Sequence, residues 1–257
     1  MIEIEAAVVR EQGGEFTIES FDMEEPRAGE VLVRIMGVGV CHTDLTVRDQ
    51  FFSTPLPAIL GHEGSGVVEK VGEGVTTVEP GDHVVLSYAS CGHCENCMRG
   101  EYGYCPELFD RNFSGARPDA SKPCCDKHGN RVSSWFFAQS SFANLALATE
   151  RNVIKIPKDI PVELMGPLGC GIQSGAGAVM NALKPEAGSS IAVFGTGSVG
   201  LSAIMAAKVV GCAQIIAVDI NEDRLGLAEE LGATDVVNPS KTDTVAAIHA
   251  LAGGEGV

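Results

Sequence analysis

The hydrophobic positions of the chain follow two different periods, and the change falls near residue 188. Before it, short runs of β-branched residues occur at 31–35, 66–71 and 83–86, and turn residues separate them. Such runs are typical of strands in a compact antiparallel β domain. After it, short apolar runs alternate with apolar positions three and four residues apart. This second pattern predicts alternating strands and helices.

The C-terminal part of the sequence predicts a βαβαβ unit. Strands are predicted at 191–194, 215–218 and 236–237, and the second helix begins at the N-cap Asn221 and stops at Gly232. Apolar helical positions are predicted on the first and third helices, at Leu201, Ile204, Met205 and Val209, and at Val245, Ile248 and Leu251. Because dinucleotide-binding sheets are built from two such units, we expect this domain to be incomplete after its first half.

The composition favours a protein that acts on small molecules. The 34 acidic and 18 basic side chains give a net charge of −16, so the chain lacks the basic clusters that nucleic-acid binding requires. Two uncharged stretches, 164–183 and 187–207, are long enough to cross a bilayer, but their glycine and serine content favours buried strand–helix segments. The acidic N-terminus does not resemble a signal peptide. We therefore expect a cytoplasmic protein that binds neither nucleic acid nor membrane, with reduced cysteines available for metal binding or catalysis.

Four of the nine cysteines form one compact motif, with two, two and seven residues between Cys91, Cys94, Cys97 and Cys105. Residues 91–135 are polar and hold too little apolar material to bury a core of their own. Four thiolates at this spacing can close a tetrahedral structural zinc site. An iron–sulfur cluster is the competing interpretation, although the last gap is too long for the bacterial ferredoxin pattern. His93, inside the motif, is interpreted as a solvated loop residue.

A glycine-rich turn, Gly195-Thr-Gly-Ser-Val-Gly200, follows the first predicted strand of the βαβαβ unit and opens its first helix. Gly195 permits the tight turn, Gly197 lets the backbone approach a pyrophosphate, and Gly200 allows close packing of helix on strand. The helix N-terminus then faces the phosphates. Asp219, nineteen residues after Gly200, is expected to accept hydrogen bonds from ribose hydroxyls and to repel a 2′-phosphate. The motif predicts dinucleotide binding, with NAD favoured over NADP.

Three further segments are informative only in combination: Cys41-His-Thr-Asp44, Gly61-His-Glu-Gly64 and Gly169-Cys-Gly171. Together with 80–84, the four-cysteine motif and the glycine-rich turn, they make the chain resemble the zinc-containing medium-chain alcohol dehydrogenases from Ala6 to Leu251. Segments 139–143 and 166–173 are most similar to the aryl-alcohol (benzyl alcohol) dehydrogenase branch of that family.

The resemblance implies an α/β protein of two domains. A GroES-like, β-rich catalytic domain is expected at residues 1–165, with a structural-zinc lobe at 91–105. A Rossmann-type NAD-binding domain is expected at 166–257, incomplete at its C-terminus. The full-length form is expected to be a homo-oligomer.

The same resemblance implies roles for individual side chains. Cys41, His62 and Cys170 would hold a catalytic zinc ion and leave one position for water or substrate. Thr43 would receive the alcohol proton, Asp44 would orient His62, and Glu63 would lie behind the metal. The residues expected to contact the cofactor are His42, Ser174, Gly195, Gly197, Val199, Gly200, Asp219 and Arg224.

The implied activity is hydride transfer from a primary alcohol, expected to be aromatic, to NAD, with two zinc ions in each chain. Many relatives place a histidine three residues after the proton-accepting hydroxyl, where this chain has Thr46. Proton exit through the ribose hydroxyls and water is therefore our hypothesis. Two alternatives stay open. One is the glutathione-dependent formaldehyde dehydrogenase branch, with S-(hydroxymethyl)glutathione as substrate, and the other is a zinc-binding chain without turnover, because family members continue past Val257.

Overall fold

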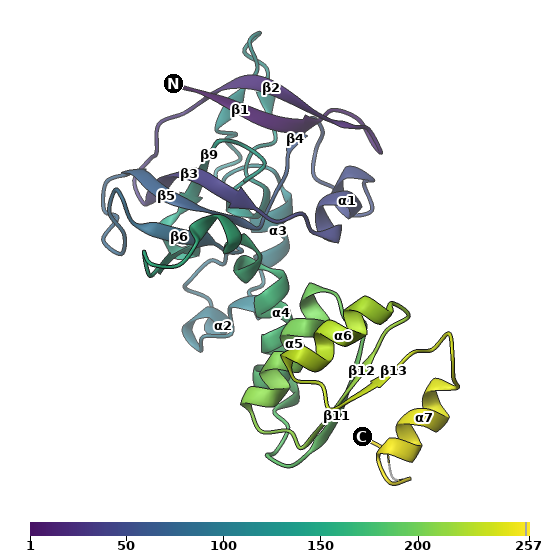
Figure 1. The fold of residues 1–257 in the computed structure, drawn as a ribbon. Helices are drawn as coiled ribbons and strands as arrows, with labels where there is room; N and C mark the ends of the chain where they lie inside the picture. Colours follow the sequence, from purple (N-terminus) through teal and green to yellow (C-terminus); the bar gives the residue numbers. More distant parts are fainter. Residues whose placement is uncertain (255) are drawn as a thin grey trace. The chain divides into compact units, whose positions relative to one another are not determined.

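The computed structural model describes residues 1–254 and 256–257 and divides into two compact units, Met1–Cys170 and Gly171–Val257. Figure 1 shows the first unit in purple to green and the second in green to yellow. The first unit is rich in antiparallel strands, and the second alternates strand and helix. Both patterns confirm the change of period predicted near residue 188.

The first unit contains two antiparallel sheets, in which the spatial order of the strands differs from their order in the sequence. One sheet consists of β4 (Ala58–Ile59), β1 (Ile2–Val9), β2 (Phe16–Met23), β7 (Cys124–Cys125) and β8 (Arg131–Val132). The other consists of β10 (Val153–Ile156), β6 (His83–Leu86), β5 (Gly64–Val71), β3 (Glu30–Val38) and β9 (Leu145–Thr149). The predicted strands at 31–35, 66–71 and 83–86 are confirmed as β3, β5 and β6.

Strand β3 is covered on both faces because successive side chains of a strand point to opposite sides. Leu32 packs with residues of β1 and β2 in one core cluster, whereas Val31 and Val33 pack with residues of β5 and β6 in another. Burial is confined to the first half of the strand, Glu30–Val33, whereas its second half is exposed or half-buried. From this second half the chain continues into helix α1 (His42–Arg48).

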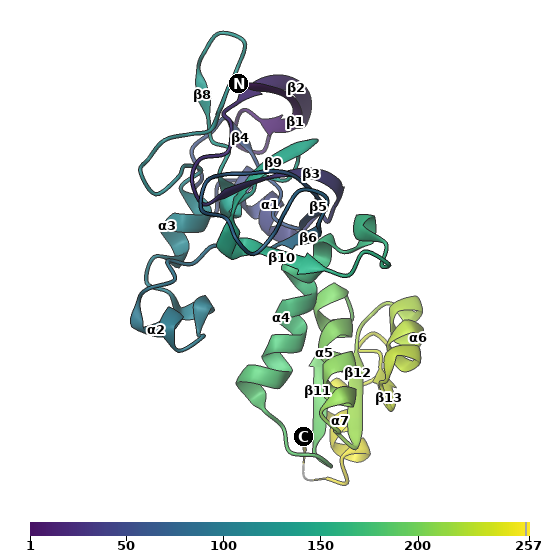
Figure 2. The same ribbon diagram turned by 90° about the vertical axis from the view of Figure 1, so that its left-hand side faces the viewer.

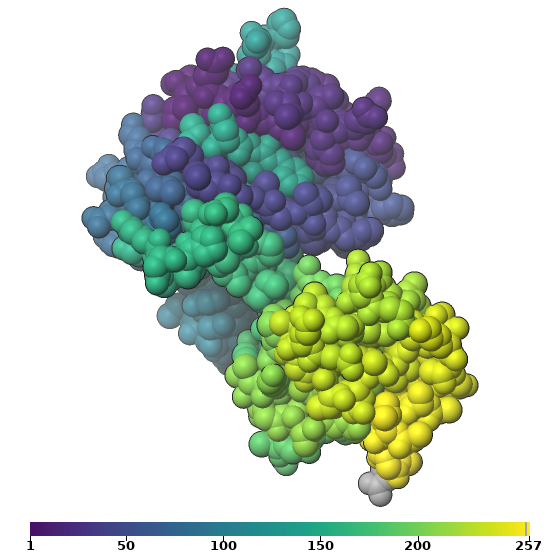
Figure 3. All heavy atoms as spheres, viewed as in Figure 1, coloured from purple at the N-terminus to yellow at the C-terminus, as the bar shows by residue number. Residues whose placement is uncertain are grey.

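The remaining helical segments of the first unit are short. They are α2 (Glu95–Met98), α3 (Leu108–Phe113), and the 3₁₀ helices η1 (Tyr102–Tyr104), η2 (Phe136–Ala138), η3 (Glu150–Asn152), η4 (Val162–Leu164) and η5 (Gly166–Gly169). Residues beyond the four-cysteine motif join the core of the unit, since Cys124, Val132 and Trp135 are buried with β1 and β2. The tip of the β7–β8 connection projects beyond β1 and β2 (Figure 3).

The second unit is the predicted βαβαβ arrangement. Its parallel sheet has the order β11 (Ser190–Phe194), β12 (Gln214–Val218) and β13 (Asp235–Val237). Its helices are α4 (Gly171–Gly177), the π-helical turn η6 (Ala178–Leu183), α5 (Ser198–Val209), α6 (Glu222–Leu231) and α7 (Thr244–Leu251). Helices α5 and α6 pack with Ile215 and Ala217 on one face of the sheet, and α7 packs with Ile216 and Val218 on the other. The predicted cap is confirmed, because the Asn221 side chain accepts a hydrogen bond from the backbone N–H of Arg224.

The predicted apolar face of α5 is partly wrong. Ile204 is buried, but Val209 is 75% exposed, and the buried face also carries Ser202, Ala203, Ala206 and Ala207. Helices α4 and α5 run side by side (Figure 2), so closely that a Cβ at Gly175 would lie 2.0 Å from the carbonyl oxygen of Val199. Because such an approach leaves no room for large side chains, the interface uses small ones.

The stripe predicted on α7 is also only partly buried. Ile248 contacts the core, whereas Val245 is 66% exposed and Leu251 is 38% exposed. In the described part of the chain, no helix is both long and apolar enough to cross a membrane.

Candidate active site and metal centres

Four side chains that could bind a metal ion converge in the first unit from three separate segments. Cys41 is the N-cap of α1, His62 and Glu63 lie between β4 and β5, and Cys170 follows η5. One potential ligand atom from each of the four lies within 4.8 Å of those of the others. His62 and Glu63 are buried, whereas both cysteines are half-buried, so the group lies at the margin of the core.

The Asp44 carboxylate ties two of these segments together. Its Oδ2 accepts a hydrogen bond from the Cys41 N–H (3.0 Å), and its Oδ1 accepts from the Gly61 N–H (3.1 Å) and contacts His62 Nδ1 (3.0 Å). Both side chains are fully buried. An ionised carboxylate requires a proton on Nδ1, which leaves the Nε2 lone pair of neutral His62 free to bind a metal ion.

Nε2 of His62 is buried and has no hydrogen-bond partner among the described residues. A buried polar atom without a partner costs free energy. Here the imidazole lies within 4.8 Å of the sulfur atoms of Cys41 and Cys170. Thiolates and imidazole nitrogens together are typical zinc ligands. Thr43 also contacts this group, since its Oγ1 lies 3.6 Å from the Sγ of Cys41.

The two cysteines of this group differ in acidity. The neighbouring Cys170 thiol, followed by His62, lowers the pKa of Cys41 to about 3, whereas the proximity of Cys41, followed by burial, raises the pKa of Cys170. Burial has the largest effect on His62 and lowers its pKa, but Asp44 and Cys41 outweigh it and raise the pKa to about 9.

Close backbone packing positions Glu63. A Cβ at Gly39 would lie 2.0 Å from the Glu63 Oε2, and a Cβ at Gly166 would lie 2.1 Å from the Glu63 carbonyl oxygen. The Gly39 N–H donates to that same oxygen (3.0 Å). Only glycine fits at these two positions, which explains why the motifs around Cys41 and Cys170 contain it.

A group of phenylalanines borders His62. The sequence analysis did not identify this aromatic group. The Phe137 ring stacks on the imidazole with centroids 4.5 Å apart, and Phe136 meets it edge-on at 5.6 Å. Phe113 contacts Phe137 in turn and leads to Phe109 and Phe52. Phe136 is fully buried, whereas Phe52 is 47% exposed and Phe109 is 52% exposed. The aromatic group therefore extends from a candidate ligand to the surface of the unit.

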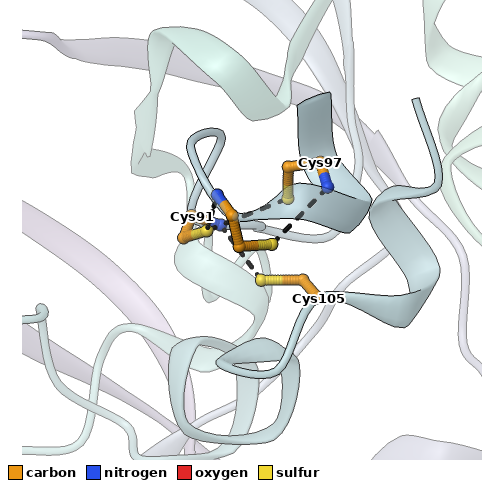
Figure 4. A group of neighbouring side chains, drawn as sticks. Cys91, Cys97 and Cys105 are labelled. Atoms are coloured by element: carbon orange, nitrogen blue, oxygen red, sulfur yellow. Dashed lines mark hydrogen bonds between the residues drawn. The ribbon is translucent and has the colours of Figure 1, made fainter. Parts of the chain in front are cut away.

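The four-cysteine motif forms a second compact group. The sulfur atoms of Cys91, Cys94, Cys97 and Cys105 all lie within 4.8 Å of one another. Figure 4 shows the side chains of Cys91, Cys97 and Cys105 pointing toward one another, and the sulfur atoms of Cys91 and Cys97 are 3.9 Å apart. His93 is exposed over 74% of its side chain, but its Nδ1 lies 3.0 Å from the Cys91 carbonyl oxygen, and it forms a third group of potential metal ligands with Cys91 and Glu107.

Backbone N–H groups of this loop point at its sulfur atoms. The N–H of Cys94 donates to the Cys91 Sγ (3.3 Å), and that of Cys97 donates to the Cys94 Sγ (3.5 Å). Led by the backbone N–H of His93, these bonds lower the pKa of Cys91 to about 6, while for Cys94 the bond from the Cys97 N–H lowers the pKa, but burial and the neighbouring sulfurs outweigh it and raise the pKa to about 11. Such N–H···S bonds stabilise thiolates, the form in which cysteine binds metal.

The glycine-rich turn lies at the carboxyl end of β11 in the second unit. Gly195 has a φ of +89°, and a Cβ at Gly200 would lie 1.7 Å from the Gly195 carbonyl oxygen, so the turn requires both glycines. No atom lies within 4 Å of the place where a Cβ of Gly197 would be. The Asp219 carboxylate accepts from the N–H groups of Thr196 (2.7 Å) and Asn221 (2.9 Å). Chiefly through the Thr196 bond, these contacts lower the pKa of Asp219.

The remaining predicted cofactor residues are exposed. Val199 and Arg224 lie in the first turns of α5 and α6, and Ser174 lies on α4 in the same unit. His42 is exposed at the start of α1 in the first unit. Of the cysteines outside the two clusters, Cys124 is buried, which raises its pKa to about 12, and Cys125 and Cys212 are half-buried. The described residues include all nine cysteines, and none forms a disulfide.

The fold and its motifs define a zinc-dependent dehydrogenase with a nucleotide-binding unit. Residues 27–158 match the family model of the alcohol dehydrogenase GroES-like domain, and residues 198–257 match that of the zinc-binding dehydrogenases. The chain belongs to the zinc-containing medium-chain alcohol dehydrogenase family, whose members oxidise alcohols to aldehydes with NAD. The resemblance and the two-domain fold class inferred from the sequence are thereby confirmed.

Relatives match nearly the whole chain. A geraniol dehydrogenase of Castellaniella defragrans is 50% identical over 254 residues, which make up 98% of this chain and 68% of the relative. A solved zinc-binding-domain alcohol dehydrogenase of Burkholderia ambifaria is 54% identical with a TM-score of 0.96, and the benzyl alcohol dehydrogenase of Acinetobacter calcoaceticus is 52% identical with a TM-score of 0.92. Both structures align with 98% of this chain, which spans 68% of each.

Proposed function

We propose that Cys41, His62 and Cys170 bind one zinc ion, at which the chain oxidises a primary alcohol with NAD. The single observation that carries the proposal is the buried, unpartnered Nε2 of His62 facing two thiols. The residues fit zinc, because two thiolates and a neutral imidazole are a known catalytic ligand set with a fourth position open. Zinc binding requires both cysteines as thiolates and His62 as the neutral imidazole, so metal uptake would release protons.

We propose a second zinc ion in the four-cysteine loop. Four sulfur atoms around one zinc ion, each about 2.3 Å from it, lie roughly 3.8 Å apart. The 3.9 Å separation of the Cys91 and Cys97 sulfurs fits a single ion. A multi-iron cluster separates its thiolates further, so the loop geometry favours zinc over iron–sulfur.

The chemistry divides between the bound groups and the side chains. A zinc ion would supply the Lewis acidity that makes an alcohol hydroxyl acidic, and NAD would accept the hydride. Asp44 keeps the Nδ1 proton in place, so that Nε2 remains a ligand throughout. Thr43 Oγ1, beside Cys41, is in position to receive the proton of the alcohol hydroxyl. Glu63, packed against Gly39 and Gly166, adds negative charge next to Cys170.

The aromatic group beside His62 supports an apolar, unsaturated alcohol as the substrate. Geraniol and benzyl alcohol, which name two of the relatives, are primary alcohols whose carbinol carbon is attached to a double bond or an aromatic ring. Aromatic side chains bind such groups by offset or edge-on packing. The rings of this group offer no ion pair to the charged groups of a glutathione adduct, which disfavours that substrate.

Turnover with matched alcohols tests the proposed function. We expect the zinc-loaded chain to form NADH from benzyl alcohol and geraniol, with kcat/KM at least about tenfold above that for ethanol, because apolar burial lowers the barrier by more than 1.4 kcal/mol. S-(hydroxymethyl)glutathione is expected to react poorly. Absence of NADH from every alcohol, with both metal groups filled, would reject the enzymatic role in favour of a zinc-binding chain without turnover.

The Phe137 side chain is expected to affect this preference. Phe137→Ala should lower kcat/KM for benzyl alcohol about tenfold and leave that for ethanol within a factor of about two, since one aromatic contact contributes about 0.5–1.5 kcal/mol. Phe16→Ala is the matched control, because that ring packs edge-on against Phe142 and makes no ring contact with His62. Equal losses with both alcohols would indicate a general structural effect of Phe137 instead.

The choice between NAD and NADP is assigned to Asp219. We expect Asp219→Asn to weaken NAD binding roughly tenfold or more, because a hydrogen bond to a charged group contributes about 1.5–3 kcal/mol. NADP binding should improve, since the repulsion of the 2′-phosphate is removed. Dissociation constants from nucleotide titrations provide the measurement. Asp223→Asn, an exposed change in the first turn of α6, controls for net charge, and identical constants in both variants would contradict the assignment.

A further inference from the structure

Gln139 is a buried amide whose hydrogen bonds surround the segment containing His62 and Glu63. It is 1% exposed. Its Oε1 accepts from the Gly64 N–H (3.1 Å), and its Nε2 donates to the His62 carbonyl oxygen (3.0 Å). Because one end of the amide is an acceptor and the other a donor, only this orientation satisfies both backbone groups. The amide therefore pairs with the backbone on both sides of Glu63, much as a neighbouring strand would.

The same amide reaches the segment that carries Cys170. Nε2 of Gln139 also lies 3.4 Å from the Ser87 carbonyl oxygen, and the Ser87 hydroxyl donates to the Gly169 carbonyl oxygen (3.3 Å). A Cβ at Gly169 would lie 2.0 Å from the Leu86 carbonyl oxygen, so the two segments are in direct backbone contact. A continuous buried path thus runs from His62 through Gln139 and Ser87 to the residue before Cys170.

The turn that presents Gln139 is in an unfavourable conformation. Phe137, Ala138 and Ser140 have φ values of +52°, +50° and +45°, which residues with a Cβ seldom adopt. Surrounding contacts hold it, because Asn152 Nδ2 donates to the Ala138 carbonyl oxygen (3.2 Å) and Ser140 Oγ donates to that of Ile59 (2.7 Å). Several adjacent residues kept in such a conformation point to a functional constraint.

We infer that Gln139 is a positioning residue that holds the His62–Glu63 and Cys170 segments at the separation one metal ion requires. The inference rests on the proposed function, because the role given to the Gln139 amide is to support that metal site. Gln139 contacts the backbone of the ligand residues and not their side chains. Its removal would leave the ligands present but free to move apart. Mutation of residues that orient metal ligands commonly lowers metal affinity by about 10- to 100-fold.

Metal retention tests the inference independently of turnover. We expect Gln139→Met, which keeps the side-chain length and removes every hydrogen bond, to lose the metal of the Cys41–His62–Cys170 site to a chelator about tenfold faster than the native chain. The metal of the four-cysteine loop should leave at the native rate. With cobalt in place of zinc, the visible absorption of the three-ligand site should shift, because cobalt bands report ligand geometry.

Gln50→Met is the matched control, because the Gln50 amide also bridges backbone carbonyls in the same unit, those of Val47 and Thr54. Native release and native cobalt spectra for Gln139→Met would overturn the inference, and so would equal acceleration in Gln50→Met. Should Gln139→Met fail to fold, Ser87→Ala, which removes the hydroxyl that donates to Gly169, must accelerate release, and native release would overturn the inference. Absence of turnover in the native chain would reject the proposed function but would leave these metal measurements readable.

Discussion

Replacement of Cys170 by alanine is expected to remove one metal ion from each chain and to lower alcohol oxidation by roughly a thousandfold or more, equivalent to about 4 kcal/mol of transition-state stabilisation. Cys170 is half-buried at the end of the first unit and contributes little to its core, so the chain should stay folded. Its sulfur lies within 4.8 Å of the Cys41 sulfur. Without it, Cys41 and His62 offer two protein ligands, and zinc binding is weak.

Metal content by mass spectrometry and NADH formation from benzyl alcohol provide the measurements for Cys170→Ala. Cys212→Ala is the matched control, since Cys212 is also half-buried but packs against the core of the second unit and belongs to neither cysteine group. Native metal content and turnover in Cys170→Ala would show that Cys170 is not a ligand. The aldehyde-forming site would then have to lie elsewhere.

Loss of a cysteine from the four-cysteine loop is expected to destabilise the folded loop and to affect alcohol oxidation only indirectly. Structural zinc contributes about 10–16 kcal/mol to the folding of zinc-finger peptides. The loop contains only the four-residue helix α2 and the 3₁₀ helix η1, and it exposes Met98 and Tyr104, so it has little apolar core of its own. Cys97→Ala should therefore unfold the loop and release its metal.

Limited proteolysis with mass-spectrometric mapping measures this local unfolding. We expect rapid cleavage between Cys91 and Cys105 in Cys97→Ala, and the same cleavage when a strong chelator empties the native loop. Cys125→Ala should resist cleavage like the native chain, because Cys125 lies in β7 and belongs to neither cysteine group. A protease-resistant loop in Cys97→Ala would mean that metal does not stabilise this segment.

Local signals predicted much of the fold. The runs at 31–35 and 83–86 are strands because β-branched residues between turn residues have few alternatives, and Asn221 caps α6 through a contact only three residues away. Val209 and Val245 belong to the apolar stripes predicted on α5 and α7, but both are exposed. Periodicity identifies which residues share a helix face, but the partner decides which face is buried, and α4 approaches α5 too closely for large side chains.

The candidate sites were predictable to different degrees. The four-cysteine motif and the glycine-rich turn are local in sequence, so their spacing was informative by itself. Cys41, His62 and Cys170 meet through tertiary packing, and only the family resemblance linked them; their role as ligands stays a prediction. Phe137 and Gln139 were missed as participants because their turn has a left-handed backbone without the glycines that usually mark one.

The Asp44 carboxylate makes the integrity of helix α1 inseparable from the state of the imidazole. One oxygen caps the helix at the Cys41 N–H, and the other holds the ring of His62 and the N–H of Gly61. Fraying of the first helical turn would therefore let the imidazole rotate, and rotation of the imidazole would weaken the cap. Ordering of the first turn of α1 and orientation of the His62 ring are therefore coupled through one side chain.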